Sequence, residues 1–491
     1  MAGFVEGAGR QQAMLFPETL DDYVGEANPV RVVDAFVEML DLAALGFRTA
    51  AKETGRPGYH PGLMLRIYVY GYLNRIQSSR RLETECGRNL ELIWLTSRLQ
   101  PDFKTIANFR KENGPAIRKV CRQFVLFCRD MSLLDADTVA VDGSRFKAVN
   151  AKSKSFTLEK LRRKTKDIDA GIARYMAELV RADAAEAEGG QPLPKGRLER
   201  LARKLSFLVR EAEETRAMQA RMEASGETQV SLTDPDARSM TTTARHPRVI
   251  GYNVQSVVDA EHHLIVAHEV TMQGFDRGAL SGMAIAAQEV MTTDDLHAVA
   301  DKGYYSSEQL LACERAGITA TVPKPNTSGA GARGQYDRAD FVYDAESDTY
   351  ACPAGKALTY RYARAEDGLQ MRRYWTNACP GCPLKSMCTT GTERRMRRWE
   401  HEDVLERVQQ RIADDPLIMR IRRQTVEHPF GTIKAWMGAT HFTMKRLKNV
   451  ATEMALHVLA YNMKRVMKIL GVPAMLAALQ ASTAPARPAA W

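Results

Sequence analysis

Apolar residues recur at helical spacing through most of the first 135 residues. One run places its apolar side chains on a single helix face, at Val33, Phe36, Val37 and Leu40. Further helices are predicted to begin at His60-Pro61 and at Asp102. Proline fits a first helical turn, and an aspartate side chain accepts hydrogen bonds from the free backbone N–H groups there. We therefore predict an all-helical N-terminal domain over residues 1–135.

Basic side chains are threaded through these predicted helices. They are Arg75, Arg80, Arg81, Arg88, Lys104, Arg110, Lys111, Arg118 and Lys119. Short helices with capped starts and basic faces are typical of DNA-docking modules of the helix-turn-helix type. A plain helical bundle with a solvated basic face explains the same pattern, so both interpretations stay open.

The pattern changes at Thr138, where short β-branched runs replace the helical repeat. Runs suited to strands lie at 138–142, 251–259, 264–270, 297–300 and 318–322. Helical runs at 277–291 and 307–316 alternate with the later ones. This alternation predicts an α/β domain over residues 136–325. Two long helical runs, at 157–186 and 198–223, interrupt it as a hairpin inserted at about 150–230, with a turn at 189–194.

The last third of the chain divides into three parts. Residues 326–400 read as a polar linker followed by a cysteine-cluster insertion. Residues 401–470 return to a helical pattern and belong with the α/β domain. Residues 471–491 are rich in alanine and proline, and we expect a disordered tail there.

Charge and composition narrow the class of protein. The chain has 69 Lys and Arg against 59 Asp and Glu, a net charge of +10, which favours a polyanionic partner such as nucleic acid or anionic lipid. A slightly basic enzyme has the same balance. No run reaches the roughly 18 apolar residues of a membrane span, and the first ten residues do not resemble a secretory signal. We therefore expect a cytoplasmic protein with no membrane partner.

Three carboxylates stand at informative places in this order of elements. Asp142 is predicted to end the first strand, Asp301 to end a later strand, and Glu427 to lie in the helical region after the last strand. Acids that converge in one crevice repel one another, and two divalent cations such as Mg²⁺ or Mn²⁺ would relieve that repulsion. A two-metal site of this kind supports phosphoryl displacement. Taken singly, each aspartate is more often a turn cap.

The three acids also stand in distinctive local sequences, which are VDGSR at 141–145, ADKGYY at 300–305 and VEHPFGTIK at 426–434. Other runs accompany them, namely LDDYV at 20–24, NPVR at 28–31, YHP at 59–61, GYNVQ at 251–255 and AYNMKR at 460–465. Together they resemble bacterial insertion-sequence DDE transposases, in the large branch of the IS-four superfamily that carries a cysteine cluster. The resemblance covers nearly the whole chain. It implies an RNase H-like catalytic fold in which Asp142, Asp301 and Glu427 hold the metals.

The same superfamily places Tyr, Arg, Glu and Lys at fixed offsets around the third acid. Arg423 and Lys434 match the basic positions, and on a continuous helix they share a face with Glu427, where they would grip DNA phosphate. Arg420 occupies the tyrosine position, so that role is in doubt here. Pro429 lacks an N–H group, and we expect the helix to kink or restart there. An ordinary solvated helix face is the alternative for both cations.

Other polar residues near the acids carry weaker expectations. Arg145 and Lys147 follow Asp142 closely and are candidates for contact with the DNA backbone. Lys302 is next to Asp301, and contact with DNA and a structural ion pair are equally consistent with its position. His428 is next to Glu427, but a two-metal displacement needs no general base, so packing or a hydrogen bond is the better interpretation.

The eight cysteines fall into two groups. Cys86, Cys121, Cys128 and Cys313 are scattered singly through helical sequence and are predicted to be small core residues. Cys352, Cys379, Cys382 and Cys388 cluster, and a CxxC pair in a turn suits a tetrahedral structural Zn²⁺ site. Reduced thiols or a redox pair remain alternatives. Basic residues flank the cluster and suit either DNA or solvent, at Arg394, Arg395, Arg397 and Arg398.

The function implied by the resemblance is that of a DNA transposase. Such an enzyme binds the terminal inverted repeats of an insertion sequence, cleaves the element ends and joins them to target DNA by two-metal phosphoryl transfer. The implied partners are double-stranded DNA and a second copy of the chain in the DNA complex, with a location at the nucleoid. An RNase H-like endonuclease without strand transfer, or a catalytically degenerate DNA-binding protein, are the alternatives.

Overall fold

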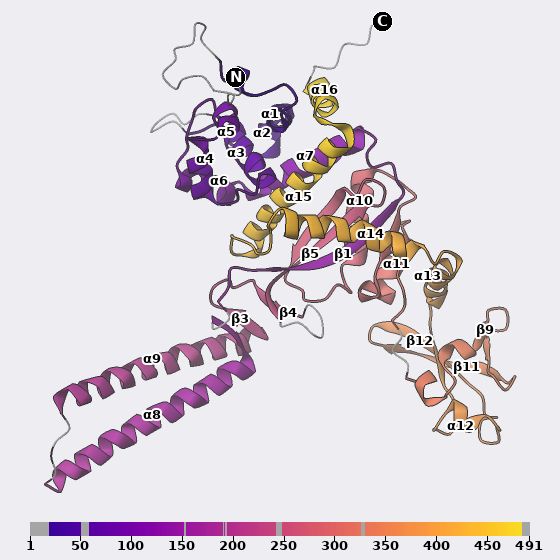
Figure 1. Ribbon diagram of the computed structural model, residues 1–491. Helices are drawn as coiled ribbons and strands as arrows, with labels where there is room; N and C mark the ends of the chain where they lie inside the picture. Colours follow the sequence, from indigo (N-terminus) through magenta and orange to yellow (C-terminus); the bar gives the residue numbers. More distant parts are fainter. Residues whose placement is uncertain are drawn as a thin grey trace, which may run out of the picture.

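The computed structural model of the protein describes residues 19–50, 58–151, 154–189, 191, 194–241, 248–325 and 329–483 (Figure 1). Parts of two predicted features lie outside these ranges. They are residues 190, 192 and 193 of the hairpin turn and residues 484–491 of the predicted tail. The N-terminal segment 1–18 lies outside them as well.

The N-terminal region is helical, as predicted. Its helices are α1 (Pro29–Met39), α2 (Leu42–Leu45), α3 (Pro61–Leu73), α4 (Ser79–Cys86), α5 (Leu90–Leu95), α6 (Phe103–Glu112) and α7 (Gly114–Asp130). Local sequence explains where several of them begin. The Asn28 side chain accepts a hydrogen bond from Val30 N, and Asp102 accepts from Lys104 N and Thr105 N. These side chains satisfy backbone donors that a first helical turn leaves free.

A central sheet follows in the strand order β6-β5-β1-β7-β8, with β4 alongside the start of β5. The strands are β1 (Thr138–Lys147), β4 (Arg238–Met240), β5 (Val249–Asp259), β6 (Ile265–Thr271), β7 (His297–Ala300) and β8 (Thr319–Thr321). β1, β7 and β8 run parallel, whereas β5 pairs antiparallel with β1 and with β6. The mixed α/β architecture is therefore confirmed, with a helical region before it.

The first strand is longer than its sequence pattern indicates. We predicted that it ends at Asp142, but β1 continues to Lys147, and Asp142 pairs with Ser256 in its interior. Only the parallel pairing with β7 stops, at Val141. The five residues after Val141 include a glycine and three polar side chains, so they lack the apolar signature of a strand, while β5 still pairs with their backbone.

Helices cover this sheet and tie it to the N-terminal region. They are α10 (Leu280–Met291), α11 (Ser307–Arg315), α13 (Glu402–Asp414), α14 (Ile418–Gly431) and α15 (Leu447–Leu470). α14 passes across β1, and its Phe430 ring lies 6.1 Å from that of Phe146. α14 continues through Pro429 without restarting, and a π-helical turn, Thr432–Trp436, follows it directly. A wider turn after the proline takes up the irregularity that we had expected as a kink.

α15 is buried over most of its length and joins the two parts of the molecule. It packs on α3 and α7 on one side and on β6 on the other. The His457 ring lies 4.7 Å from that of Tyr72. The Asn462 amide exchanges two hydrogen bonds of 2.9 Å with the backbone of Ile265. One continuous apolar core therefore runs from the N-terminal helices into the sheet, across the domain boundary predicted at residue 135.

The predicted helical hairpin is present and projects from the body of the protein (Figure 1). Its helices are α8 (Leu158–Ala187) and α9 (Lys195–Ser225), with β2 (Ser155–Thr157) and β3 (Gln229–Ser231) paired at its base. A small separate core closes the base, formed by Phe156, Leu161, Met222 and Val230. The hairpin is thus packed largely by itself.

The segment predicted as polar linker and cysteine insertion contains a second sheet, which the sequence pattern did not show. Its strands, in the order β13-β12-β11-β10-β9, are β9 (Val342–Asp344), β10 (Thr349–Ala351), β11 (Ala357–Glu366), β12 (Leu369–Trp375) and β13 (Met396–Trp399), and a short helix, α12 (Lys385–Cys388), precedes β13. A few large side chains form its core, namely Phe341, Tyr350, Leu358, Tyr374 and Met396. Much of β11 is exposed, so no alternation of apolar and polar residues marks it in the sequence.

The C-terminal tail differs from our expectation of disorder. Val472–Thr483 forms a helix, α16, that packs on α1. Met475 and Leu479 are 0% exposed. Pro473 stands in the first turn of this helix, where its missing N–H is not needed, rather than acting as a breaker. None of the described helices combines the length and apolar character that crossing a membrane requires.

Replacing Leu479 with alanine tests whether α16 stabilises the fold. Because the side chain is fully buried, we expect Leu479→Ala to lower the free energy of unfolding by about 2–5 kcal/mol, as measured by urea denaturation. The exposed substitution Ala477→Ser on the same helix should change it by less than about 0.5 kcal/mol. Equal unfolding curves for Leu479→Ala and the unsubstituted protein would show that the tail does not pack.

Candidate catalytic site

Two of the three predicted acids lie side by side at the same edge of the parallel pairing. Val141 of β1 pairs with Ala300 of β7, and Asp142 and Asp301 are the residues that directly follow this pair in the sequence. Both residues therefore lie at the carboxyl end of the parallel pairing, which is where side chains of such a sheet face a crevice. The Asp142 side chain is 25% exposed and that of Asp301 45%, so a ligand can reach both.

Arg422 of α14 supplies a positive charge to this pair of acids. Its Nη2 atom lies 2.6 Å from Asp142 Oδ1 and 3.9 Å from Asp301 Oδ2. The Arg422 side chain is only 12% exposed, so solvent screens these interactions less than it would at a free surface. Its buried Nε atom finds no hydrogen-bond partner within the described part of the chain. The guanidinium is therefore well placed for the acids and incompletely satisfied elsewhere.

The local electrostatics favour a cation at this position. Burial raises the pKa of the Asp142 carboxyl, and Arg422 opposes that rise. The nearby carboxylates of Asp301 and Asp276 raise the same pKa further. Burial and the neighbouring carboxylates thus express the cost of holding negative charge in a crowded, partly dry site. The donor set of Asp142 and Asp301 consists of carboxylate oxygens, which are the ligands that Mg²⁺ and Mn²⁺ prefer, so these two residues fit such an ion.

Glu427, the third predicted acid, does not join this group. It is exposed on α14, five residues after Arg422, which corresponds to about 140° around a helix at about 100° per residue. Arg422 points to the sheet, so Glu427 faces the flank of the helix. Among the described residues, no three side chains of His, Cys, Asp or Glu come together as a group that could hold a metal ion.

The two cations predicted beside Glu427 occupy different environments. Arg423 is exposed on α14. Lys434, in the π-helical turn, points back to β1, where its Nζ donates to Ser144 Oγ at 2.6 Å and to the carbonyl of Arg145 at 3.0 Å. Burial, followed by the charge of Arg145, lowers the Lys434 pKa, and Asp142 opposes this effect. The Lys434 ammonium is thus held next to the strand that carries Asp142.

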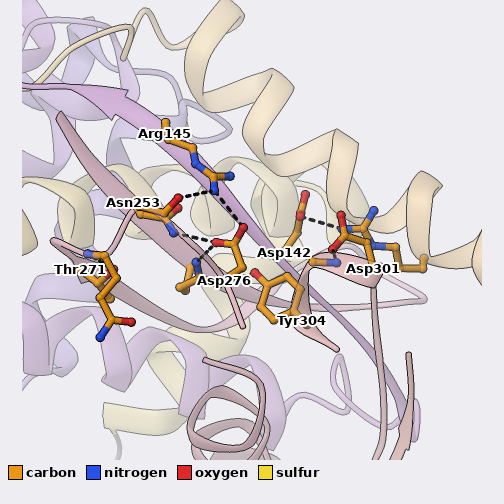
Figure 2. Close-up of polar contacts among 12 residues, drawn as sticks. Asp142, Arg145, Asn253, Thr271, Asp276, Asp301 and Tyr304 are labelled. Atoms are coloured by element: carbon orange, nitrogen blue, oxygen red, sulfur yellow. Dashed lines mark hydrogen bonds and ion pairs between the residues drawn. The ribbon is translucent and has the colours of Figure 1, made fainter. Parts of the chain in front are cut away.

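A polar network that we did not anticipate lies behind β1 (Figure 2). The Asp276 carboxylate accepts hydrogen bonds of 2.7 Å from Asn253 Nδ2 and from Gln255 Nε2. Tyr304 donates to the Gln255 side-chain oxygen through its hydroxyl. Asn253 and Gln255 are buried polar side chains in the middle of an otherwise apolar strand. That interruption of the apolar run is the signal in the sequence from which such a network could have been predicted.

Gly143 makes room for this network. A Cβ atom at position 143 would lie 2.5 Å from Gln255 Nε2 and 2.6 Å from Asp276 Oδ1. The absence of a side chain next to Asp142 therefore lets buried polar groups pack against the strand that carries it. The network with Gln255 and Asp276 thus packs on one face of β1 at this point, and Arg422 contacts Asp142 from the α14 side.

Arg145, predicted as a DNA contact, belongs to the same network. Its Nη2 atom lies 3.0 Å from Asp276 Oδ2 and 3.0 Å from the carbonyl of Gly274. The Arg145 side chain is 19% exposed. Its charge is therefore committed to Asp276, and we do not keep Arg145 as a contact to the DNA backbone.

The remaining predicted residues lie at the surface or in internal contacts. Lys147 is exposed at the end of β1, and Lys302 is exposed in the short 3-10 turn after β7. His428 Nδ1 lies 2.8 Å from the Tyr461 hydroxyl, in keeping with the predicted hydrogen-bonding role. Arg110, counted among the basic residues of the N-terminal helices, is buried and donates to the Tyr72 hydroxyl at 2.7 Å, so it faces the core.

The four clustered cysteines line one small pocket of about 30 Å³ in the second sheet region. Burial raises the pKa of Cys388, Arg394 opposes that effect, and the three other thiols raise the pKa further. The backbone N–H of Lys356 points at Cys352 Sγ, 3.4 Å away. The four thiols are free and are not arranged as a formed metal site. The scattered cysteines Cys86, Cys121, Cys128 and Cys313 are buried, as predicted.

Comparison with known proteins adds independent information. Residues 18–112 match a family model described as a transposase domain (DUF772). Residues 351–467, which include Glu427, match a model described as a transposase DDE domain. No curated protein sequence matches the chain.

One solved structure is similar, a cryo-EM structure of a piggyBac transposase synaptic complex with hairpin DNA. Its identity is 7% and its TM-score is 0.33, over 93% of this chain and 79% of that chain. Two folds at that score need not share a topology. The assignment rests on the two family matches, which support an insertion-sequence DDE transposase.

Proposed function

We propose that this transposase binds the terminal inverted repeats of its insertion sequence, cleaves the element ends and joins them to target DNA by two-metal phosphoryl transfer. The observation that carries the proposal is the placement of Asp142 and Asp301, which are adjacent, reachable from solvent and already in contact with a cation. A site that concentrates negative charge in this way suits divalent cations, on which DDE transposases depend.

The strand arrangement supports an RNase H-like catalytic domain. When the short strand β4 is left out, the order β6-β5-β1-β7-β8 places the third, second, first, fourth and fifth strands of the central sheet next to one another. Three antiparallel strands come first in the chain, and two further strands extend the sheet in parallel with the first. In such a domain the first and fourth strands carry acids at their shared edge, as β1 and β7 do here.

We assign the metal ligands to Asp142, Asp301 and Glu427. The bound ions would activate a water molecule or a 3′-hydroxyl and stabilise the leaving oxygen. The chain must change in two ways to complete this group. The Arg422 guanidinium has to leave the space between the aspartates, and Glu427 has to turn from the flank of α14 toward them.

We assign DNA contact in this region to three cations. Arg423 shares the exposed flank of α14 with Glu427, Lys434 is fixed beside Ser144, and Lys147 is exposed at the end of the same strand. Charge-assisted hydrogen bonds from such side chains hold phosphate oxygens strongly. The exposed basic side chains of the N-terminal helices would add sequence recognition of the element ends, and a second copy of the chain would hold the paired end.

We also propose a structural Zn²⁺ ion among Cys352, Cys379, Cys382 and Cys388. The support is their convergence on one pocket and the N–H of Lys356 directed at Cys352 Sγ, a contact that stabilises a thiolate. The surrounding sheet has a core of only a few large side chains. A small core of that size gains stability from a metal crosslink.

The proposed reaction is tested by removing one acid at a time. With Mg²⁺ and DNA from the regions that flank the gene, Asp142→Asn, Asp301→Asn and Glu427→Gln should each lower cleavage by roughly 100-fold or more, because metal-held charge is worth several kcal/mol in the transition state. Binding of the same DNA, measured by gel shift, should persist. Glu289→Gln, an exposed carboxylate on α10, is the control and should cleave normally.

Full activity of Asp142→Asn would refute the metal-site assignment. The DNA products on an agarose gel also distinguish strand transfer from cleavage alone. Joined products with added target DNA indicate transposition, whereas cut ends alone indicate an endonuclease.

The competition between Arg422 and metal is tested by calorimetric titration with Mn²⁺. Because Arg422→Gln removes a charged hydrogen bond worth about 1.5–3 kcal/mol, we expect about tenfold or tighter Mn²⁺ binding and a lower melting temperature without metal. Arg423→Gln, at the neighbouring exposed position, should leave both quantities unchanged. Equal or weaker Mn²⁺ binding by Arg422→Gln would show that this guanidinium does not compete with the ion.

The zinc proposal is tested by elemental analysis of protein purified without chelators. We expect one Zn²⁺ per chain, and we expect Cys379→Ser combined with Cys382→Ser to lose the ion and melt at a lower temperature, because the second sheet then lacks its crosslink. Cys313→Ala, a buried cysteine elsewhere, controls for general destabilisation and should retain zinc. Unsubstituted protein without zinc would rule out the site.

A further inference from the structure

A second site lies on the side of α14 that faces α15. A pocket of about 260 Å³ opens between the end of α14, the π-helical turn and α15. Its walls carry four cationic side chains, from Arg75, Lys464, Arg465 and Lys468. His428, Thr432 and Trp436 line it from the α14 side, at a spacing of four residues that aligns them along the helix.

The positive charge of this pocket is not neutralised by any residue that the structure describes. In the described part of the chain, no carboxylate forms an ion pair with any of the four cations. Arg465 uses its Nε atom on the carbonyl of His262, at 2.7 Å, which leaves its charge uncompensated. Four close, uncompensated cations form a site for a polyanion.

Trp436 gives the pocket a second property. Its side chain is 71% exposed, although tryptophan side chains bury a large apolar surface when they pack in a protein core. The π-helical turn holds this side chain at the pocket wall, and such turns occur frequently at functional sites. An exposed aromatic ring among cations offers a stacking surface beside phosphate ligands, which is how proteins bind single-stranded nucleic acids.

The size of the pocket selects among forms of DNA. Pockets for small molecules are about 300–1,000 Å³, so 260 Å³ admits roughly one nucleotide and excludes a duplex. Stacking also requires a base that has left its own stack. We propose that this pocket binds an unpaired nucleotide of DNA, with its base on Trp436 and the adjoining phosphates on Arg75, Lys464, Arg465 and Lys468.

This inference rests on the proposed function, because cleavage at the element ends is what would expose unpaired nucleotides beside α14. Glu427 and His428 are consecutive, so the pocket begins one residue from the third acid. A strand released at the catalytic site can reach Trp436 by passing over this helix, from the flank that carries Glu427 to the flank that carries His428. The pocket would hold the cut strand while its end awaits the next step.

The test measures DNA binding without added Mg²⁺ or Mn²⁺ and without a chelator, so that no cleavage takes place and the proposed structural Zn²⁺ is kept. Fluorescence anisotropy with a labelled 12-nucleotide single strand and with the matching duplex gives the two affinities separately. Trp436→Ala should weaken single-strand binding by roughly 5- to 100-fold, the range for loss of one stacked base, and should leave duplex binding unchanged. Trp436→Tyr should restore most of the affinity, because tyrosine also stacks.

The cations are tested by their salt dependence. Lys464→Ala combined with Lys468→Ala should weaken single-strand binding and reduce the slope of log K against log salt by about 1.4, at about 0.7 for each lost phosphate contact. Lys448→Ala, an exposed lysine of α15 outside the pocket, is the matched control and should change neither. Melting temperatures equal to that of the unsubstituted protein confirm folding, and we expect them because the substituted side chains, Trp436, Lys464, Lys468 and Lys448, are all exposed.

Two outcomes would overturn the proposal. One is unchanged single-strand affinity in Trp436→Ala, and the other is an equal loss for single strand and duplex, which would indicate a general DNA surface. Because the assay needs no metal, it is independent of the cleavage test. A protein that does not cleave but shows the Trp436 effect retains the pocket, whereas one that cleaves without the effect retains the proposed function alone.

Discussion

Repulsion between Asp142 and Asp301 is the constraint around which this protein is built. Parallel pairing of β1 and β7 forces the two carboxylates to leave the sheet at the same edge, and burial raises the cost of keeping them charged. A nearby positive charge lowers that cost. In the state described, Arg422 provides it, and the unsatisfied Nε of its guanidinium marks that solution as provisional.

α14 connects this constraint to the rest of the molecule. Its sheet-facing side carries Arg422, its flank carries Arg423 and Glu427, and its opposite flank carries His428 in the pocket with Trp436. Because the helix runs on through Pro429 into a π-helical turn, a small rotation of one element would change all three surfaces together. The proposed exchange of Arg422 for metal, the proposed approach of Glu427 and the proposed nucleotide pocket therefore all involve this one helix.

Much of this arrangement follows from local sequence signals, and the rest depends on tertiary contacts. β7 and the position of Asp301 after it were predicted correctly, because a short apolar run ended by a polar residue is a strong local signal. The continuation of β1 beyond Asp142 was missed, since pairing with β5 rather than its own composition maintains it. The sheet around the cysteines was also missed, because a few large side chains far apart in the sequence form its core and leave no regular apolar pattern along its strands. The ion pair of Arg145 with Asp276 joins residues far apart in the chain, and no local pattern could show it.

The buried course of α15 has a consequence for how this protein can be modified. Its side chains fill the N-terminal helical region and the central sheet at once, with His457 against Tyr72 and Asn462 bridging to β6. Grafting the N-terminal helices of a related protein onto this sheet would leave mismatched surfaces on both sides of one helix. Recombination among relatives should therefore preserve the first and last segments of the chain as a matched pair, while the self-packed hairpin of α8 and α9 is free to be exchanged.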